Sequence, residues 1–282
     1  MALDIQPSGQ TCGATVRGID LSRPLTDEAL TELRQAWLRH QVINLPDQAL
    51  TPKSMLALAD RLGPKSEDPY LVGLPEQPRV VEVRREPDEK ARIFADNWHS
   101  DWSFLAQPPS ATMLYGVEIP PTGGDTLFEN LIAACAALPA SKLAALSKLN
   151  AIHSAKLGYA RNGRYGDADA GRSMNITASD SALATQEHPL IRVHPETGQQ
   201  ALFISPAYTI GIAGMSEQSG ADLLKELFEY IQQPEFIYRH QWQAGMLTIW
   251  DNRCLNHRAT GGYEGHRRLL HRVTVGEPHA YV

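Results

Sequence analysis

The sequence has few cysteines, and none of them stands in a redox or metal-binding spacing. Its 282 residues include three, Cys12, Cys135 and Cys254, with no CxxC or CxxxC pair among them. An odd number at these separations favours neither a disulfide framework nor a cysteine zinc site. The pattern is typical of a protein from a reducing compartment, and we expect a cytoplasmic location.

Long apolar runs and a cationic start are also missing. The longest apolar stretch, LIAACAALPA at 131–140, is too short to cross a bilayer. The first ten residues, MALDIQPSGQ, contain neither a basic start nor an apolar core, which argues against a signal peptide. The sequence therefore predicts no membrane partner.

Basic residues are not in excess. Lys and Arg together number 26 against 32 Asp and Glu, which gives a formal net charge of -6. A nucleic-acid binder normally needs a surplus of cations to neutralise phosphates, so DNA and RNA are not expected partners. The hydrophobic fraction of 43% and the charged fraction of 21% are those of an ordinary globular protein.

Two amphipathic helices and a strand are expected near the start of the chain. Residues 26–40 begin with a threonine cap and an acidic first turn, and apolar residues then recur at helical spacing. Residues 51–63 carry a capping threonine, a proline at the first helical position and a final glycine. The apolar segment QVINLPD at 41–47, which contains a terminating proline, is the predicted strand between them.

From residue 79 onward the pattern changes to short runs bounded by turn residues, which predict strands of a sandwich or barrel. Helical stretches at 140–149 and 216–232 lie between these runs. Residues 157–182 are rich in Gly, Asp, Asn and Ser and too polar to bury, so we expect a long loop of the kind that serves as a lid. The predicted strands are 79–86, 110–119, 124–130, 191–205, 245–252 and 267–275.

The segment NWHSDWSF at 97–104 places an imidazole and a carboxylate two positions apart. On extended backbone His99 and Asp101 face the same side, where both can bind one ion. A second imidazole, His257, follows the apolar TIWD segment. Two histidines and a carboxylate on one face of an octahedral ion leave three positions open, as in non-haem Fe(II) oxygenases. Zinc with a bound water, or a surface histidine bonded to its neighbour's carboxylate, are the alternatives.

The last predicted strand, HRRLLHRVTV, carries two arginines on one face. Alternation puts Arg268 and Arg272 on the same side of the strand. A fixed guanidinium beside the metal would grip the far carboxylate of a dicarboxylic acid whose near end chelates iron. The alternative is a solvated strand with charged outer positions.

Three segments together resemble a known family. They are NWHSDWSF, PPTGGDTLF at 120–128 and WDNRCLNHRATGGYEGHRRLLHR at 250–272, and they are similar to the iron and 2-oxoglutarate dependent dioxygenases of the taurine dioxygenase and 2,4-dichlorophenoxyacetate dioxygenase family. The resemblance extends through nearly the whole chain, including LRHQVINLPDQALTP near the start and ETGQQALFIS in the middle.

The resemblance implies a mixed, mainly β fold: a double-stranded β-helix, or jelly roll, with flanking helices and a lid-bearing insertion. We expect one dioxygenase domain over residues 1–282. Its core strands are expected roughly at 79–130 and 188–276, with the insertion roughly at 131–187.

The family pattern also implies roles for individual residues. It makes His99, Asp101 and His257 the iron ligands. Arg268, which stands eleven residues after His257, becomes the clamp for the far carboxylate of 2-oxoglutarate. Thr126 is expected to hydrogen-bond that same carboxylate.

The residues around the substrate are less defined by the pattern. Arg272 matches a family arginine that meets either the anionic group of the substrate or the near carboxylate of 2-oxoglutarate. Asn97, Trp102, Phe104 and Tyr159 are candidate pocket residues. Large aromatic side chains beside a buried site are also frequent in ordinary cores, so that alternative stays open.

The activity implied is hydroxylation of a C–H bond of a small organic acid by O2, with Fe(II) as cofactor and 2-oxoglutarate as co-substrate, giving succinate and CO2. The acid carries a carboxylate, sulfonate or sulfate ester, and the adjacent bond breaks when the hydroxylated carbon bears a leaving group. A zinc hydrolase with the same His/Asp/His ligands and a non-catalytic jelly roll that binds a small acid are the other hypotheses. A homo-oligomer is expected.

Overall fold

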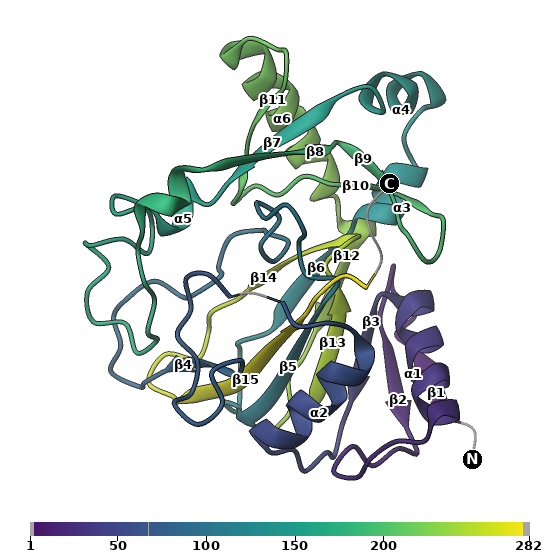
Figure 1. Cartoon of the computed structure of the whole chain (residues 1–282), viewed down its shortest axis with the longest axis vertical. Helices are drawn as coiled ribbons and strands as arrows, with labels where there is room; N and C mark the ends of the chain where they lie inside the picture. Colours follow the sequence, from purple (N-terminus) through teal and green to yellow (C-terminus); the bar gives the residue numbers. More distant parts are fainter. Residues whose placement is uncertain (1–2, 67, 279–282) are drawn as a thin grey trace.

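The chain is mainly β, with helices packed on the outside (Figure 1). The computed structural model describes residues 3–66 and 68–278. The outer ends of the predicted 1–282 domain therefore lie outside the described residues. The mainly β class expected from the sequence is confirmed.

The helices and strands have the following bounds. The helices are α1 (Asp27–His40), α2 (Pro52–Leu62), α3 (Leu131–Ala136), α4 (Ala140–Leu146), α5 (Lys156–Tyr159) and α6 (Glu217–Ile231), with short 3-10 turns η1 (Asp180–Leu183) and η2 (Pro234–Phe236). The strands are β1 (Asp4–Pro7), β2 (Ala14–Arg17), β3 (Val42–Leu45), β4 (Val81–Arg85), β5 (Ala111–Glu118), β6 (Thr126–Asn130), β7 (Asn150–Ser154), β8 (Thr185–Pro189), β9 (Ile191–Val193), β10 (Gln200–Leu202), β11 (Thr209–Ile212), β12 (Ile237–His240), β13 (Leu247–Asp251), β14 (Leu255–Ala259) and β15 (Arg268–Val275).

The largest sheet has seven strands in the order β1-β2-β3-β13-β5-β15-β4. Its strands pair antiparallel except for β2 and β3, which are parallel. Strands from the start, middle and end of the chain thus share this sheet. The first two strands were not predicted from the sequence, and together with β3 they extend the sheet beyond the ranges expected for the core strands.

A smaller sheet of three antiparallel strands, β12-β6-β14, packs against the large one. Phe128 on β6 and Leu255 on β14 share one apolar cluster with Leu114, Trp250 and Leu270 of the large sheet. The two sheets therefore enclose a common core.

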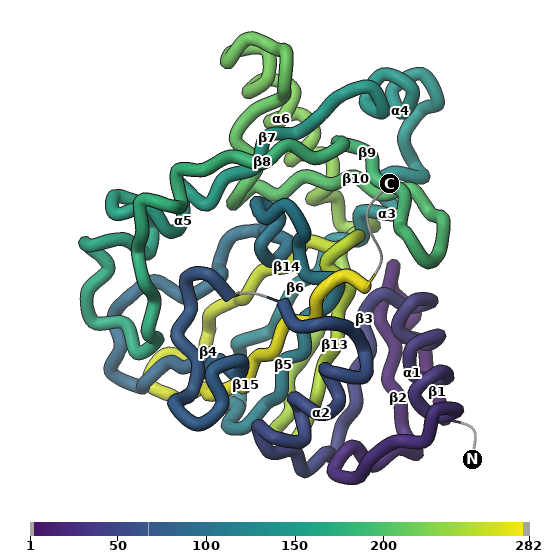
Figure 2. The backbone as a smooth tube through the Cα atoms, in the orientation of Figure 1, coloured from purple at the N-terminus to yellow at the C-terminus, as the bar shows by residue number. Residues whose placement is uncertain are grey.

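Helices α1 and α2 cover part of the large sheet (Figure 2). Leu33 and Trp37 of α1 and Met55 of α2 are buried in one cluster with Ile43 and Val273 of the sheet. Each helix starts at its predicted cap, since the hydroxyls of the threonines at 26 and 51 accept a backbone hydrogen bond in the first turn. The predicted helix, strand, helix opening is confirmed.

The segment expected to form an unburied loop is partly buried. Between α5 and η1 it contains no long helix or strand, as predicted. However, Tyr165 and Met174 are buried within it, and Val72 donates a backbone hydrogen bond to Asn175. The segment can be buried although it is polar because its charges are paired, as where Arg172 donates to Asp169 over 2.6 Å. The expectation that it was too polar to bury is wrong.

No helix in the described part of the chain is both long and apolar enough to cross a membrane. The longest apolar stretch forms the short helix α3. The cytoplasmic location stays a prediction.

Candidate active site

Two histidines and an aspartate from distant parts of the chain meet in the interior. The Nε2 atom of His99 lies 3.7 Å from Oδ1 of Asp101, and Nε2 of His257 lies 4.0 Å from Oδ2 of the same carboxylate. All three residues are buried, and one ligand atom from each lies within 4.8 Å of the others. The structure thus brings together the three residues that the sequence analysis selected.

Backbone pairing fixes the two imidazoles side by side. His257 on β14 is opposite Phe128 of β6, and it forms an isolated antiparallel bridge with His99. The bridge consists of two hydrogen bonds, from the His99 amide to the His257 carbonyl over 3.0 Å and in the reverse direction over 2.7 Å. His99 is therefore held to the small sheet although it belongs to no strand.

Sharp backbone turns stand on both sides of His99. Ala95 and Trp102 adopt positive φ angles of 61° and 48°, a region that residues with a side chain rarely occupy. Such conformations persist where the surrounding structure imposes them, and they are frequent at functional sites. Both residues belong to the segment that carries His99 and Asp101.

The protonation states suit a metal ion. Burial lowers the pKa of both His99 and His257, so their imidazoles are neutral near pH 7. Burial alone would raise the pKa of Asp101, but the Arg272 guanidinium and the hydrogen bond from Thr112 act against it, and the pKa lies below its usual value. Neutral imidazoles with an ionised carboxylate are the forms that bind a divalent metal.

A hydrogen-bonded chain orients the Asp101 carboxylate. Thr112 on β5 donates to Oδ2 of Asp101 over 2.6 Å, and Asn252 donates to the Thr112 hydroxyl over 2.9 Å. Trp250 in turn donates to the Asn252 side chain over 3.0 Å. Thr112 and Asn252 were not predicted as site residues from the sequence.

Arg268 lies at the start of β15, where its guanidinium is buried with few hydrogen-bond partners. Its Nη2 donates to the Gly124 carbonyl over 3.1 Å, whereas its buried Nε has no hydrogen-bond partner. Burial lowers its pKa, and the described residues provide no carboxylate within ion-pair distance of it. A buried guanidinium with an unpartnered donor can accept an anion as its partner.

Thr126 belongs to the same part of the interior as Arg268. The indole of Trp242 donates to the Thr126 hydroxyl over 3.0 Å, and its ring lies 5.9 Å from the Arg268 guanidinium carbon. A β-carbon at Gly124 would lie only 3.1 Å from Nε of Arg268, and Gly124 has a φ of +71°. Glycine at this position therefore leaves room beside the guanidinium.

Arg272 is positioned differently from Arg268, because two carboxylates surround it. Its Nη1 donates to Asp68, and its Nη2 lies 3.2 Å from Oδ1 of Asp101. The second contact is close enough for an ion pair but is not aligned as a hydrogen bond. Burial alone would lower the pKa of Arg272, yet these carboxylates raise it above its usual value. Asp68 was not predicted as a site residue from the sequence.

A cavity of about 270 Å³ opens beside the three residues. His99 and Asp101 line it, as do three of the four candidate pocket residues, Asn97, Trp102 and Tyr159. The fourth, Phe104, is not among the lining residues and packs instead on the rings of its aromatic neighbours. Further lining residues include Leu71, Phe94, Leu157, Arg164 and Tyr208.

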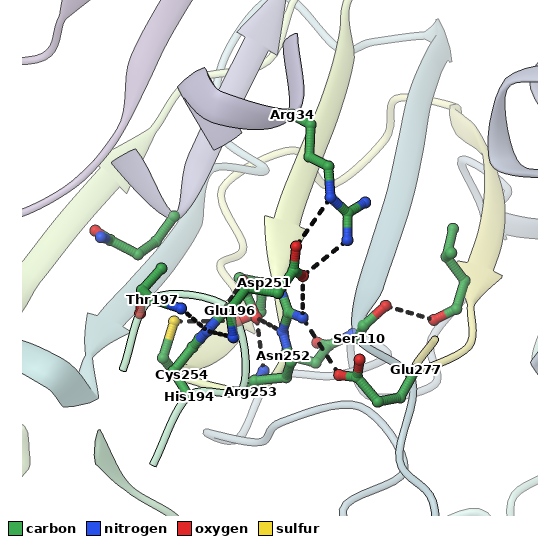
Figure 3. Close-up of polar contacts among 12 residues, drawn as sticks. Arg34, Ser110, His194, Glu196, Thr197, Asp251, Asn252, Arg253, Cys254 and Glu277 are labelled. Carbon is green, nitrogen blue, oxygen red and sulfur yellow. Dashed lines mark hydrogen bonds and ion pairs between the residues drawn. The ribbon is translucent and has the colours of Figure 1, made fainter. Parts of the chain in front are cut away.

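A second group of potential ligands, His194, Asp251 and Cys254, is already saturated (Figure 3). The Asp251 carboxylate accepts from His194 over 2.9 Å and from both Nε and Nη2 of Arg253 over 2.8 and 2.7 Å. Burial raises the pKa of the Cys254 thiol. Arg253 also binds Glu196, which pairs with Arg34 of α1. This network joins α1, the β9-β10 connection and β13. The Arg253 guanidinium already pairs with the Asp251 carboxylate that a metal ion would need.

The chain is similar to proteins of one family along almost its whole length. Residues 4–274 match the family described as "Taurine catabolism dioxygenase TauD, TfdA family". A (S)-phenoxypropionate/alpha-ketoglutarate-dioxygenase of Sphingobium herbicidovorans is 30% identical over 280 residues, which cover 98% of this chain and 96% of the relative.

Solved structures show the same similarity. A taurine dioxygenase from Burkholderia xenovorans superimposes with a TM-score of 0.81 at 30% identity, covering 98% of this chain and 91% of that one. The protein AAD-2, solved with Mn(II) and N-oxalylglycine, has a TM-score of 0.77 at 27% identity, covering 99% of both chains. These similarities favour the dioxygenase prediction over a zinc hydrolase or a non-catalytic acid-binding protein. The chain belongs to the TauD, TfdA family and is an Fe(II)/2-oxoglutarate-dependent dioxygenase.

Proposed function

We propose that His99, Asp101 and His257 hold the Fe(II) of this dioxygenase. The observation that carries the proposal is the convergence of three buried ligand atoms of suitable protonation state, two of them from residues that line a cavity. Two imidazoles and one carboxylate leave three positions of an octahedral ion open. When bound, iron supplies the redox chemistry with O2 that amino acid side chains cannot provide.

Arg268 and Thr126 are the proposed binding site for the far carboxylate of 2-oxoglutarate. Nε of Arg268 is a buried donor without a partner. Trp242 lies against both residues, which supports a shared binding site. That AAD-2 was solved with the dicarboxylic acid N-oxalylglycine and a divalent metal supports the same arrangement here.

The finer description of the fold is also a proposal. We infer that the large sheet and the β12-β6-β14 sheet form the two halves of a jelly-roll core within one dioxygenase domain, with an insertion at about residues 131–187. Their shared apolar cluster supports this arrangement. Residues 157–182 form the lid over the site in this proposal, because Leu157, Tyr159 and Arg164 line the cavity. Covering the site would exclude water from reactive species.

The proposed substrate is a small organic acid with an apolar body. Relatives are named for a phenoxypropionate, a carboxylic acid, and for taurine, a sulfonic acid. The cavity offers apolar surface from Leu71, Phe94 and Leu157 next to the metal ligands. In this chain those side chains position the substrate, and hydroxylation of a C–H bond near Asp101 gives the product, with cleavage of the next bond when that carbon carries a leaving group. A homo-oligomer stays a prediction.

Metal dependence and turnover together test the proposal. Metal-free protein is reconstituted in parallel with Fe(II) or Zn(II), and succinate release is measured under air with 2-oxoglutarate and a panel of carboxylic, sulfonic and sulfate-ester acids. The expected result is succinate only with Fe(II), increased by at least one of the acids. Hydrolysis of the esters with Zn(II) and no succinate with Fe(II) would contradict it.

A further inference from the structure

We propose that Tyr263, in the loop between β14 and β15, is a positioning residue for the Arg268 clamp. Its ring packs against the guanidinium and leaves the hydrogen-bond donors available to the far carboxylate of 2-oxoglutarate. This inference rests on the proposed function, because it concerns the same co-substrate site. Tyr263 was not predicted as a site residue from the sequence.

Two aromatic rings lie beside the Arg268 guanidinium. Its central carbon is 5.7 Å from the centroid of the Tyr263 ring and 5.9 Å from that of the Trp242 ring. Tyr263 and Arg268 are each 5% exposed, so water is largely excluded from this contact. A cation over an aromatic face is attracted by the π electrons, and the attraction is stronger where water is excluded. The Tyr263 ring therefore stabilises a buried charge for which the described residues provide no carboxylate within ion-pair distance.

An aromatic ring differs from a carboxylate because it does not use the donors of the guanidinium. Nη2 of Arg268 donates to the Gly124 carbonyl over 3.1 Å, and the buried Nε has no partner among the described residues. A carboxylate in place of the ring would occupy these donors and would repel the incoming dicarboxylic acid. The Tyr263 hydroxyl adds no negative charge either, since burial raises its pKa. Tyr263 thus stabilises Arg268 without competing with the co-substrate.

Backbone contacts hold the loop of Tyr263 against the segment that precedes β6. The Gly124 amide donates to the Gly261 carbonyl over 3.0 Å. The amide and the hydroxyl of Thr260 both donate to the Asp125 carbonyl, over 2.9 and 3.0 Å. A β-carbon added at Gly124 would lie 3.3 Å from Cδ1 of Tyr263, so the ring packs directly against this glycine. The position of the ring is therefore set by the same segment whose carbonyl binds the guanidinium.

A competitor for the guanidinium, the Glu89 carboxylate, shares a small cavity with Arg268 and Tyr263. The volume of this cavity is about 20 Å³, which is enough for about one water molecule. Glu89 is buried and pairs with Arg85 over 3.3 Å and with Arg172 over 3.9 Å. Removal of the Tyr263 ring would enlarge the cavity and allow water or Glu89 to reach Arg268. Either partner would compete with 2-oxoglutarate for the same donors.

Binding of two 2-oxo acids to variants of Tyr263 tests the inference. The full-length protein is loaded with Mn(II), and Kd is measured by calorimetry for 2-oxoglutarate and for 2-oxopentanoate, which has a methyl group in place of the far carboxylate. Tyr263→Leu and Tyr263→Met keep an apolar side chain but remove the ring. Both should weaken 2-oxoglutarate binding by about five- to thirtyfold and 2-oxopentanoate binding by less than twofold. Tyr263→Phe retains the ring and should bind both acids as the wild type does.

The matched control is Tyr115→Leu, because Tyr115 is buried in the cluster that the large sheet forms with α1 and α2; it should leave both Kd values unchanged. Mn(II) affinity should be the same in every variant, which also shows that the metal site is intact. If the leucine and methionine variants bind 2-oxoglutarate as the wild type does, or lose both acids equally, the role of Tyr263 is overturned while the proposed function stands. The same holds if Tyr263→Phe loses as much as Tyr263→Leu. A wild type that binds 2-oxoglutarate no more tightly than 2-oxopentanoate would contradict the proposed carboxylate clamp, and the inference with it.

Discussion

Thr112 donates a 2.6 Å hydrogen bond to the carboxylate of Asp101, and both side chains are buried. Partners of this kind orient a metal ligand, and their loss typically reduces metal affinity by about 10- to 100-fold. Thr112→Val keeps the shape of the side chain and removes the donor. We expect it to weaken Mn(II) or Fe(II) binding within that range, measured by competition with a chelator. Thr112→Ser should bind nearly as the wild type does; equal affinity of the valine variant would show that the contact has no such role.

The clamp assigned to Arg268 predicts a selective effect on the co-substrate. Arg268→Ala should raise the 2-oxoglutarate concentration needed for turnover by a large factor, because a charge-assisted bidentate contact is lost. Arg268→Lys should restore little of the 2-oxoglutarate affinity, since lysine lacks the planar pair of donors. Thr126→Ala should act in the same direction but more weakly, by roughly 1 kcal/mol or somewhat more. An unchanged half-saturating concentration in Arg268→Ala would place this arginine outside the site.

Gly124 is expected to be necessary for the same pocket. An added β-carbon would stand 3.1 Å from Nε of Arg268, and the φ of +71° disfavours any side chain. Gly124→Ala should therefore lower both stability and 2-oxoglutarate affinity. Gly171→Ala is the control, because its φ is +75° with open space around the new β-carbon; it should cost a similar strain, on the order of 1 kcal/mol, without affecting the co-substrate. Equal co-substrate affinity in both variants would contradict this account.

Glu129 predicts a pH dependence of stability. It is fully buried beside Asn256, and burial raises its pKa to about 8, against the lowering effects of the Asn256 hydrogen bond and of Arg258. The folded state therefore keeps a proton that the unfolded state, in which the glutamate has its ordinary pKa of 4.5, releases at lower pH. The free energy of unfolding should fall as pH rises from about 4.5 to 8, by roughly 2 kcal/mol between pH 6 and pH 8. Urea unfolding of wild type and Glu129→Gln checks this, and the variant should lose that slope; an identical slope in both would refute it.

The helices and many strands were predictable because their signals are local. Threonine caps mark the starts of α1 and α2, and apolar runs mark β3, β5 and β13. The assignment of strands to sheets was not predictable in the same way. The pairing of β3 with β13 joins residues about two hundred positions apart, and the sequence of neither strand specifies which strand it pairs with.

The same distinction applies to the candidate site. His99, Asp101, His257 and Arg268 were selected because they stand in family motifs of fixed spacing. Asp68 could not be selected, because its partner Arg272 is 204 positions away and no motif joins them. Similarly, the polar composition of the loop concealed its burial, since the pairing of its charges becomes visible only when the chain is folded.

The central claim is that the buried His99, Asp101 and His257 group holds the iron on which turnover depends. The most direct measurement is iron bound per chain, together with succinate formed, after anaerobic reconstitution of the wild type and of Asp101→Ala. Circular dichroism establishes that the variant is folded. We expect close to one iron per wild-type chain with succinate formation, and loss of both in folded Asp101→Ala. Full iron content and full succinate formation in that variant would contradict it.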